Sequence, residues 1–135
     1  MPFPIEERFI EAAEAKLGLR LPQAYRRKLM RENGGELSLP PDHWQLFPVL
    51  DTSNKKRLKR TCNDIVLETK NSQEWAGFPP QGVAIGANGG GDNLLFMPSA
   101  DDPSTLASDL FWWDHETGQL HRIHSTLDEL FPKTG

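Results

Sequence analysis

The side chains with the greatest capacity for metal chemistry lie near the end of the chain. His115, His121 and His124 are close together in sequence and neighbour Asp114 and Glu116. Imidazole and carboxylate groups are common ligands of transition metals. However, His121 and His124 are an odd number of residues apart, so a continuous strand points them to opposite faces. The His-Glu-x-x-His pattern of a helical zinc site is also absent from the sequence. We therefore expect no metal centre.

Patterns for covalent or acid–base catalysis are equally weak. The sequence has no Gly-x-Ser-x-Gly nucleophile elbow, and nothing in it places Cys62, the only cysteine, beside a histidine. Asp101 and Asp102 form a carboxylate pair in a Pro- and Ser-rich loop, where we expect no tuning of a pKa by burial. The Gly-rich segment 86–93 lacks the Lys and Ser/Thr of a phosphate loop, and its glycines fit a hairpin turn. We predict a protein that is not an enzyme and needs no cofactor.

Charge is distributed unevenly along the chain. The net charge is -4, but residues 1–70 carry 13 Lys+Arg against 10 Asp+Glu, whereas residues 71–135 carry 2 against 9. No Lys or Arg lies between Lys70 and Arg122, and this segment holds seven acids: Glu74, Asp92, Asp101, Asp102, Asp109, Asp114 and Glu116. A segment of one sign attracts basic partners. The alternative is that the acids are scattered over loops and only favour solubility.

Two adjacent tryptophans follow in the strand predicted over residues 110–114. Side chains alternate along a strand, so one tryptophan should enter the core and the other should face away from it. An outward tryptophan bordered by acids is typical of an interface anchor, unless a loop covers it. We predict one partner-binding face, opposite the helices, with these residues: Asp92, Asp101, Asp102, Asp109, Trp112, Trp113, Asp114 and Glu116.

The one basic run, residues 55–60, has a different interpretation. Its Lys and Arg side chains could contact nucleic acid phosphates. It lacks the interleaved aromatic residues of a single-strand binding platform. We therefore predict a solvated helix face and no direct binding of nucleic acid.

Apolar periodicity predicts helices first and strands afterwards. Helices are expected over 5–17, from Pro22 to the Asn33-Gly34-Gly35 stop, and from the caps at Thr52-Ser53-Asn54 to Thr69 with Cys62 in the core. Pro40-Pro41 marks a loop before a strand over 44–50. Short apolar runs separated by turns predict strands at 83–86, 94–97, 110–114 and 120–123, and a capping box at Thr126 predicts a last helix.

Length and composition set the class of protein. The 135 residues suit one domain, and no apolar run is long enough for a membrane helix. The N-terminus lacks the features of a signal peptide, and a single cysteine fits a reducing compartment, so we expect a cytoplasmic protein without membrane contact. We predict a single α+β domain, an antiparallel β-sheet meander with helices packed mainly on one face.

Several motifs occur in a recognisable order over nearly the whole chain. They are Leu17-Gly18-x-x-Leu21-Pro22-x-x-Tyr25 with Asn33-Gly34-Gly35, then Trp44-x-Leu46-Phe47, Ile85-Gly86 with Gly90-Gly91-Asp92, Trp113-Asp114-His115-Glu116-Thr117-Gly118, and the Ser125 to Phe131 helix. Together they resemble the SUKH superfamily in its Smi/Knr-type branch. The loop from Pro98 to Asp109 is longer than the tight hairpin usual in that family and is a candidate specificity element.

The resemblance implies a function as well as a fold. Bacterial members are immunity proteins that bind and neutralise a cognate polymorphic toxin, often a nuclease, whereas fungal members are cell-wall regulators and signalling scaffolds. For this chain the resemblance favours an immunity protein that occludes a toxin with a basic surface, since nucleases need such a surface to hold phosphates. A regulatory scaffold is the alternative, and a small hydrolase is less favoured.

Overall fold

The computed structural model describes residues 3–39, 42–123 and 127–130. Helices and strands follow one another in this order: α1 (Glu7–Leu17), α2 (Gln23–Arg31), β1 (Gly35–Leu39), β2 (Asp42–Leu46), α3 (Lys55–Arg60), α4 (Ile65–Ser72), β3 (Val83–Ala87), β4 (Asn93–Pro98), β5 (Leu106–Trp113), β6 (Leu120–Ile123) and α5 (Leu127–Leu130). The predictions for Pro40-Pro41, His124 and Thr126 lie outside the described residues.

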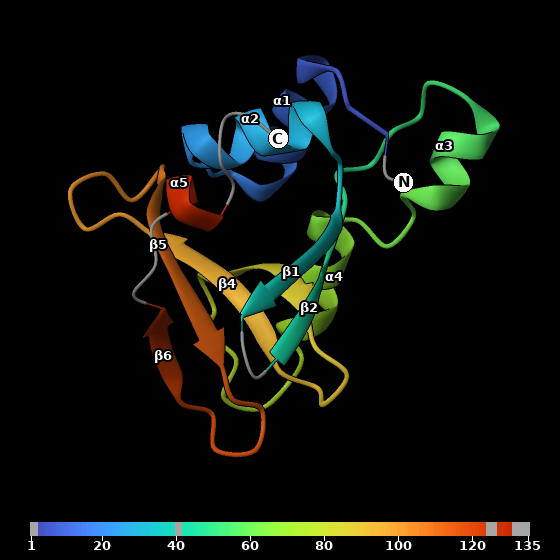
Figure 1. The fold of residues 1–135 in the computed structure, drawn as a ribbon. Helices are drawn as coiled ribbons and strands as arrows, with labels where there is room; N and C mark the ends of the chain where they lie inside the picture. The colour runs from blue at the N-terminus through green and yellow to red at the C-terminus, as the bar shows by residue number, and fades with distance from the viewer. Residues whose placement is uncertain (1–2, 40–41, 124–126, 131–135) are drawn as a thin grey trace.

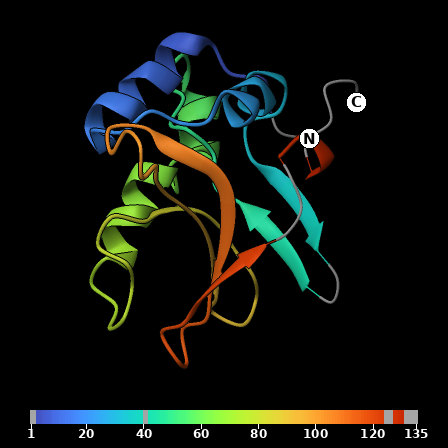
Figure 2. The ribbon, with the colours of Figure 1, turned by 90° about the vertical axis from the view of Figure 1, so that its left-hand side faces the viewer.

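The strands form one six-stranded sheet in which spatial order equals sequence order, β1 to β6. Every pair is antiparallel, and the sheet curls so that β1 and β2 stand opposite β5 and β6 (Figures 1 and 2). The prediction of a single α+β domain with an antiparallel meander is confirmed. Within the described ranges, no helix is long and apolar enough to span a bilayer.

Strand β1 was not expected from the sequence. Gly34 and Gly35 have φ of 107° and 94°, values that other residues rarely adopt, and they turn the chain from α2 directly into β1. The Asn33 amide fixes this turn, because its Nδ2 donates to the Val49 carbonyl at 2.8 Å and its Oδ1 accepts from the Val49 N–H at 2.7 Å. The Asn-Gly-Gly motif therefore ends one element and starts the next.

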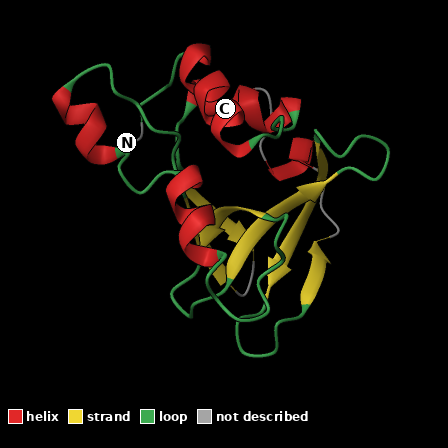
Figure 3. Ribbon diagram, turned by 180° about the vertical axis from the view of Figure 1, so that it is seen from behind, coloured by secondary structure: helices red, strands yellow, loops and turns green. Residues whose placement is uncertain are grey.

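Helices pack on the sheet through a few large side chains. From α2, the ring of Tyr25 meets Phe96 of β4 edge-on at 5.2 Å, and both are fully buried. On the other side, α4 lies along β3, where the Thr69 hydroxyl accepts the Ala84 N–H at 2.9 Å beside a bulge in the β3–β4 register. Figure 3 shows α4 against the sheet and α3 projecting from the body of the molecule.

Asn54 caps α3 as predicted, but the single helix predicted from there to Thr69 is wrong, because the chain forms two helices. The carboxylate of Asp64 accepts the N–H groups of Val66 and Leu67 at 3.0 and 3.1 Å, so α4 begins with its own N-cap. Cys62 lies in the break between the helices and is exposed, not in the core as predicted. The apolar periodicity from Leu58 to Thr69 continues across Asp64, but the cap that Asp64 provides starts a new helix there.

The loop between β4 and β5 is attached to the helical layer. The Arg20 N–H donates to the Ser104 carbonyl at 2.9 Å, and the Leu106 N–H donates to the Arg20 carbonyl at 2.8 Å. The predicted loop from Pro98 to Asp109 is therefore shorter than expected, because β5 begins at Leu106. Arg20, in the connection between α1 and α2, holds the rest of the loop through these two hydrogen bonds.

Candidate protein-binding surface

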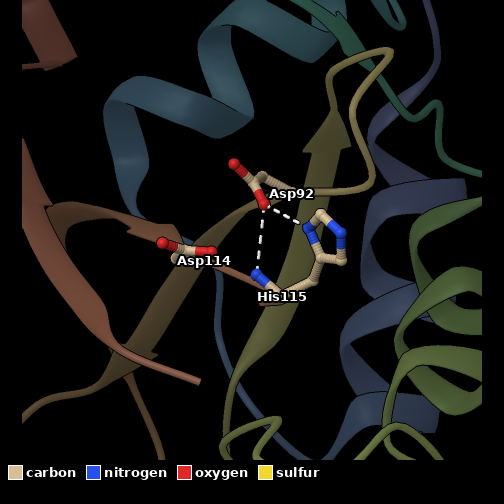
Figure 4. Close-up of side chains that lie close together, drawn as sticks. All are labelled: Asp92, Asp114 and His115. Atoms are coloured by element: carbon tan, nitrogen blue, oxygen red, sulfur yellow. Dashed lines mark hydrogen bonds and ion pairs between the residues drawn. The ribbon is translucent and has the colours of Figure 1, made fainter. Parts of the chain in front are cut away.

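Asp92 connects two hairpin turns at one end of the sheet. Its Oδ2 accepts the indole N–H of Trp112 at 2.9 Å. Its Oδ1 accepts the backbone N–H of His115 at 3.1 Å and lies 2.5 Å from the His115 Nδ1 (Figure 4). These contacts tie the β3–β4 turn to the β5–β6 turn, so the two turns present a defined surface.

The same contacts change the ionisation of both partners. Partial burial raises the pKa of Asp92, but hydrogen bonds from His115 and Trp112 outweigh burial and hold this pKa below its ordinary value. The hydrogen bond to Asp92 in turn raises the pKa of His115. Each group therefore favours the charged form of the other.

Asp92, Asp114 and His115 are also the described residues that could approach a metal ion together. Their potential ligand atoms lie within 4.8 Å of one another. However, Asp92 Oδ1 and His115 Nδ1 already contact each other, and Asp114 Oδ1 accepts the Glu116 N–H at 2.9 Å. A cation would have to replace these bonds, so the arrangement fits a clamp between turns better than an open coordination site.

The two adjacent tryptophans point to opposite faces of β5. Trp113 is 1% exposed, donates its indole N–H to the Gly77 carbonyl at 3.1 Å and packs edge-on against Phe78 at 5.2 Å. Trp112 is half-buried, with its ring 5.2 Å from that of His121 on the neighbouring strand. Trp113 is thus the core tryptophan, and Trp112 is held at the rim of the opposite face by Asp92.

Trp75 is an exposed aromatic residue that sequence reasoning missed. Its side chain stacks on Trp113 at 5.9 Å and 17°, yet 46% of the residue is exposed. The chain after α4 also approaches the β5–β6 turn, where a Cβ on Gly77 would lie 3.3 Å from the Gly118 Cα. The available signal was a tryptophan outside the predicted helices and strands, but only the fold places it beside the turns.

We define the acidic tip as the loop 73–77 with the turns 88–92 and 114–119, which lie together at one end of the sheet (Figure 1). These segments contain no Lys or Arg and carry four carboxylates: Glu74, Asp92, Asp114 and Glu116. With Trp75 exposed among them, the acidic tip combines negative charge with an aromatic side chain.

The other predicted partner residues lie elsewhere. Asp101 and Asp102 belong to the β4–β5 loop, at the opposite end of the sheet from the acidic tip. Hydrogen bonds from the Ser104 hydroxyl and N–H lower the pKa of Asp102, which caps its own loop. Asp109 lies within β5 and pairs with Arg122 of β6 at 2.9 Å. The structure therefore brings together Asp92, Trp112, Asp114 and Glu116, but not Asp101, Asp102 and Asp109.

The fold defines a small α+β domain built on an antiparallel meander. The model of the SMI1 / KNR4 family (SUKH-1) matches residues 4–133, and the chain belongs to this family. Its members are generally immunity or regulatory proteins that bind other proteins. No curated protein and no solved structure gives a significant match.

Proposed function

We propose that this chain is a cytoplasmic immunity protein that neutralises a cognate toxin by covering a basic surface of that toxin with the acidic tip. Family membership supports the general class, since SUKH proteins include toxin-immunity proteins. The proposal needs no catalytic residue, because a bound protein that blocks the substrate site is sufficient for inhibition.

The acidic tip is the observation that carries the proposal. Four carboxylates outnumber the one basic side chain among them, His115, and therefore create a negative field at one end of the molecule. A nuclease that binds phosphates carries the complementary positive field over its active site. Complementary fields raise the association rate and favour the correct orientation of the partners.

Trp75 supplies the apolar contact that charge alone does not provide. Large aromatic side chains near the centre of an interface are the commonest hot spots, and a rim of polar groups excludes water around them. At 46% exposure, Trp75 has surface left for a partner, while its stacking on Trp113 fixes its orientation. The rigid clamp at Asp92 reduces the ordering cost of binding.

The test is to express the chain with the toxin domain encoded beside its gene. We expect growth protection in cells and a complex in vitro whose affinity falls at least about tenfold in the Asp114→Lys/Glu116→Lys variant. The matched control is Asp101→Lys/Asp102→Lys, which makes the same charge change at the opposite end of the sheet. We expect it to retain affinity within about threefold.

Two results would reject the proposal. Protection that is equal for wild type and the Asp114→Lys/Glu116→Lys variant would place binding away from the acidic tip. Failure of the folded chain to bind or protect against the adjacent toxin would remove the immunity function itself.

A further inference from the structure

A cavity of about 300 Å³ lies between α3 and the β1–β2 hairpin. Gly34, Gln45 and Leu46 line the side of the hairpin, and Arg57 and Arg60 line the side of α3. Gly35 and Leu46 are paired at the open end of the hairpin, where β1 begins and β2 ends. None of the described residues that line this cavity belongs to the acidic tip.

Three basic side chains surround the ring of Phe3 at this cavity. The guanidinium carbons of Arg57 and Arg60 lie 4.6 and 5.2 Å from the ring centroid, and the Lys56 ammonium lies 5.7 Å from it. Cation–π contacts of this length are attractive, so the ring holds several positive charges close together. Phe3 is itself fixed by its carbonyl, which accepts the Asn33 N–H at 2.9 Å.

The local carboxylate does not balance this charge. Asp51 lies 3.8 Å from Arg57 through Oδ2, while its Oδ1 accepts the N–H and hydroxyl of Ser53 at 2.9 and 2.6 Å. Among the described residues, no carboxylate forms an ion pair with Arg60 or Lys56. A cavity wall with excess positive charge favours an anionic ligand.

Core packing does not explain the basic residues of α3. The helix has no buried residue, and even Leu58 is 43% exposed. The Asn54 side chain caps α3 by accepting the Arg57 N–H at 2.9 Å, and Thr61 ends it by donating its hydroxyl to the Arg57 carbonyl at 2.8 Å. The fold thus holds a basic helix over a cavity without using its side chains in the core.

We propose that this cavity binds the phosphate group of a small phosphate ester, with Arg57 and Arg60 as the phosphate ligands. Guanidinium groups donate two parallel hydrogen bonds to phosphate oxygens, which a lysine ammonium cannot do. Gly34, which has a φ of 107°, lines the cavity, and a Cβ there would lie 3.4 Å from the Leu46 carbonyl oxygen. Gln45 and Asn63 also line the cavity, and both residue types carry amide donors that could bind the organic part of the ester.

The experiment is calorimetric titration of the full chain with three phosphate probes: inorganic phosphate, ribose 5-phosphate and adenosine 5′-monophosphate. Ribose and adenosine serve as the probes without phosphate. We expect a dissociation constant below about 1 mM for at least one phosphate probe and no binding of ribose or adenosine. The most tightly bound probe identifies whether free phosphate, a sugar phosphate or a nucleotide is preferred.

Variants of α3 test whether Arg60 is a phosphate ligand. Arg60→Gln should weaken binding at least about tenfold, and Arg60→Lys should retain the charge but recover only part of the affinity. Lys59→Gln is the matched control on the same helix, and it should bind within about twofold of wild type. Circular dichroism of each variant establishes that it is folded.

The proposal is overturned if none of the three phosphate probes binds, or if Arg60→Gln binds as tightly as wild type. Equal losses in Arg60→Gln and Lys59→Gln would also overturn it, because they would indicate attraction by net charge alone. Toxin binding at the acidic tip is unaffected by any of these outcomes, so the two proposals fail separately.

Discussion

At the scale of single residues, Trp75 and Trp113 stack on each other, but one of them is exposed to solvent and the other is buried. Trp113 is 1% exposed and hydrogen-bonded to Gly77, whereas 46% of Trp75 is exposed. Tryptophan therefore has two roles here: Trp113 packs in the core, and Trp75 offers a surface that a partner could contact. Strand alternation predicted one buried tryptophan in β5, but the exposed aromatic residue comes from a loop that alternation does not describe.

Substituting each tryptophan by alanine should separate these roles. We expect Trp113→Ala to lower the free energy of unfolding by about 3–5 kcal/mol, because it leaves a cavity among buried residues. Trp75→Ala should cost less than about 1.5 kcal/mol, since half of its surface already contacts water. Urea denaturation of both variants measures the difference. A Trp75→Ala variant as unstable as Trp113→Ala would show that Trp75 is structural.

Lys28 provides a second prediction at the residue scale. Its ammonium donates to the Gly34 carbonyl, and burial lowers the pKa of Lys28 to about 8, although Glu32 opposes this shift. The unfolded chain therefore holds this proton at pH values where the folded chain has released it. Stability should rise between about pH 8 and 10.5, by at most about 1.4 kcal/mol per pH unit.

The measurement is the free energy of unfolding as a function of pH for wild type and Lys28→Met. We expect the rise above pH 8 to disappear in the variant, because it has no titrating group at this position. Identical pH profiles for the two proteins would contradict the assignment of a lowered pKa to Lys28.

At the scale of elements, the split between α3 and α4 shows where sequence patterns lose information. Helices α1 and α2 and strands β3 to β6 follow from apolar periodicity and turn residues. Periodicity continued across Asp64, however, and a capping carboxylate decides the helix start through two backbone hydrogen bonds. Strand β1 was missed for a related reason, since positive φ at Gly34 and Gly35 both ends a helix and opens a strand.

The cap at Asp64 can be tested directly. Asp64→Ala should lower the free energy of unfolding by about 1–2 kcal/mol, because it removes both bonds at the start of a helix that packs on β3. The matched control is Asn54→Ala, which removes the cap of the exposed helix α3 and should cost less, about 0.5 kcal/mol. Chemical denaturation compares them. Equal costs would indicate that packing of α4 does not depend on its cap.

At the scale of the whole molecule, the antiparallel order of the sheet divides the acidic segment between two ends. The turns after β3 and β5 lie at the acidic tip, whereas the loop after β4 must lie at the other end. Sequence reasoning assigned these acids to one face, whereas the structure places them at two ends of the sheet. It could not place Trp75 or separate Asp101 and Asp102 from Asp114 and Glu116, because these relations depend on which turns share an end.

This division predicts how association with the toxin depends on salt. Opposite charges at long range accelerate encounter, and salt screens this attraction over about 10 Å at 0.1 M. We expect the association rate constant to fall at least about tenfold between about 20 and 500 mM NaCl, with little change in the dissociation rate. Stopped-flow fluorescence at several salt concentrations measures both rates.

The two charge-reversal variants make this prediction specific to one end of the molecule. In Asp114→Lys/Glu116→Lys, association should be slow at low salt and nearly independent of salt, because the local field that attracts the toxin is cancelled. In Asp101→Lys/Asp102→Lys, the net charge changes by the same amount, but the field at the acidic tip remains, so the salt dependence should resemble that of wild type. If both variants lose the salt dependence equally, then net charge and not the acidic tip steers the encounter.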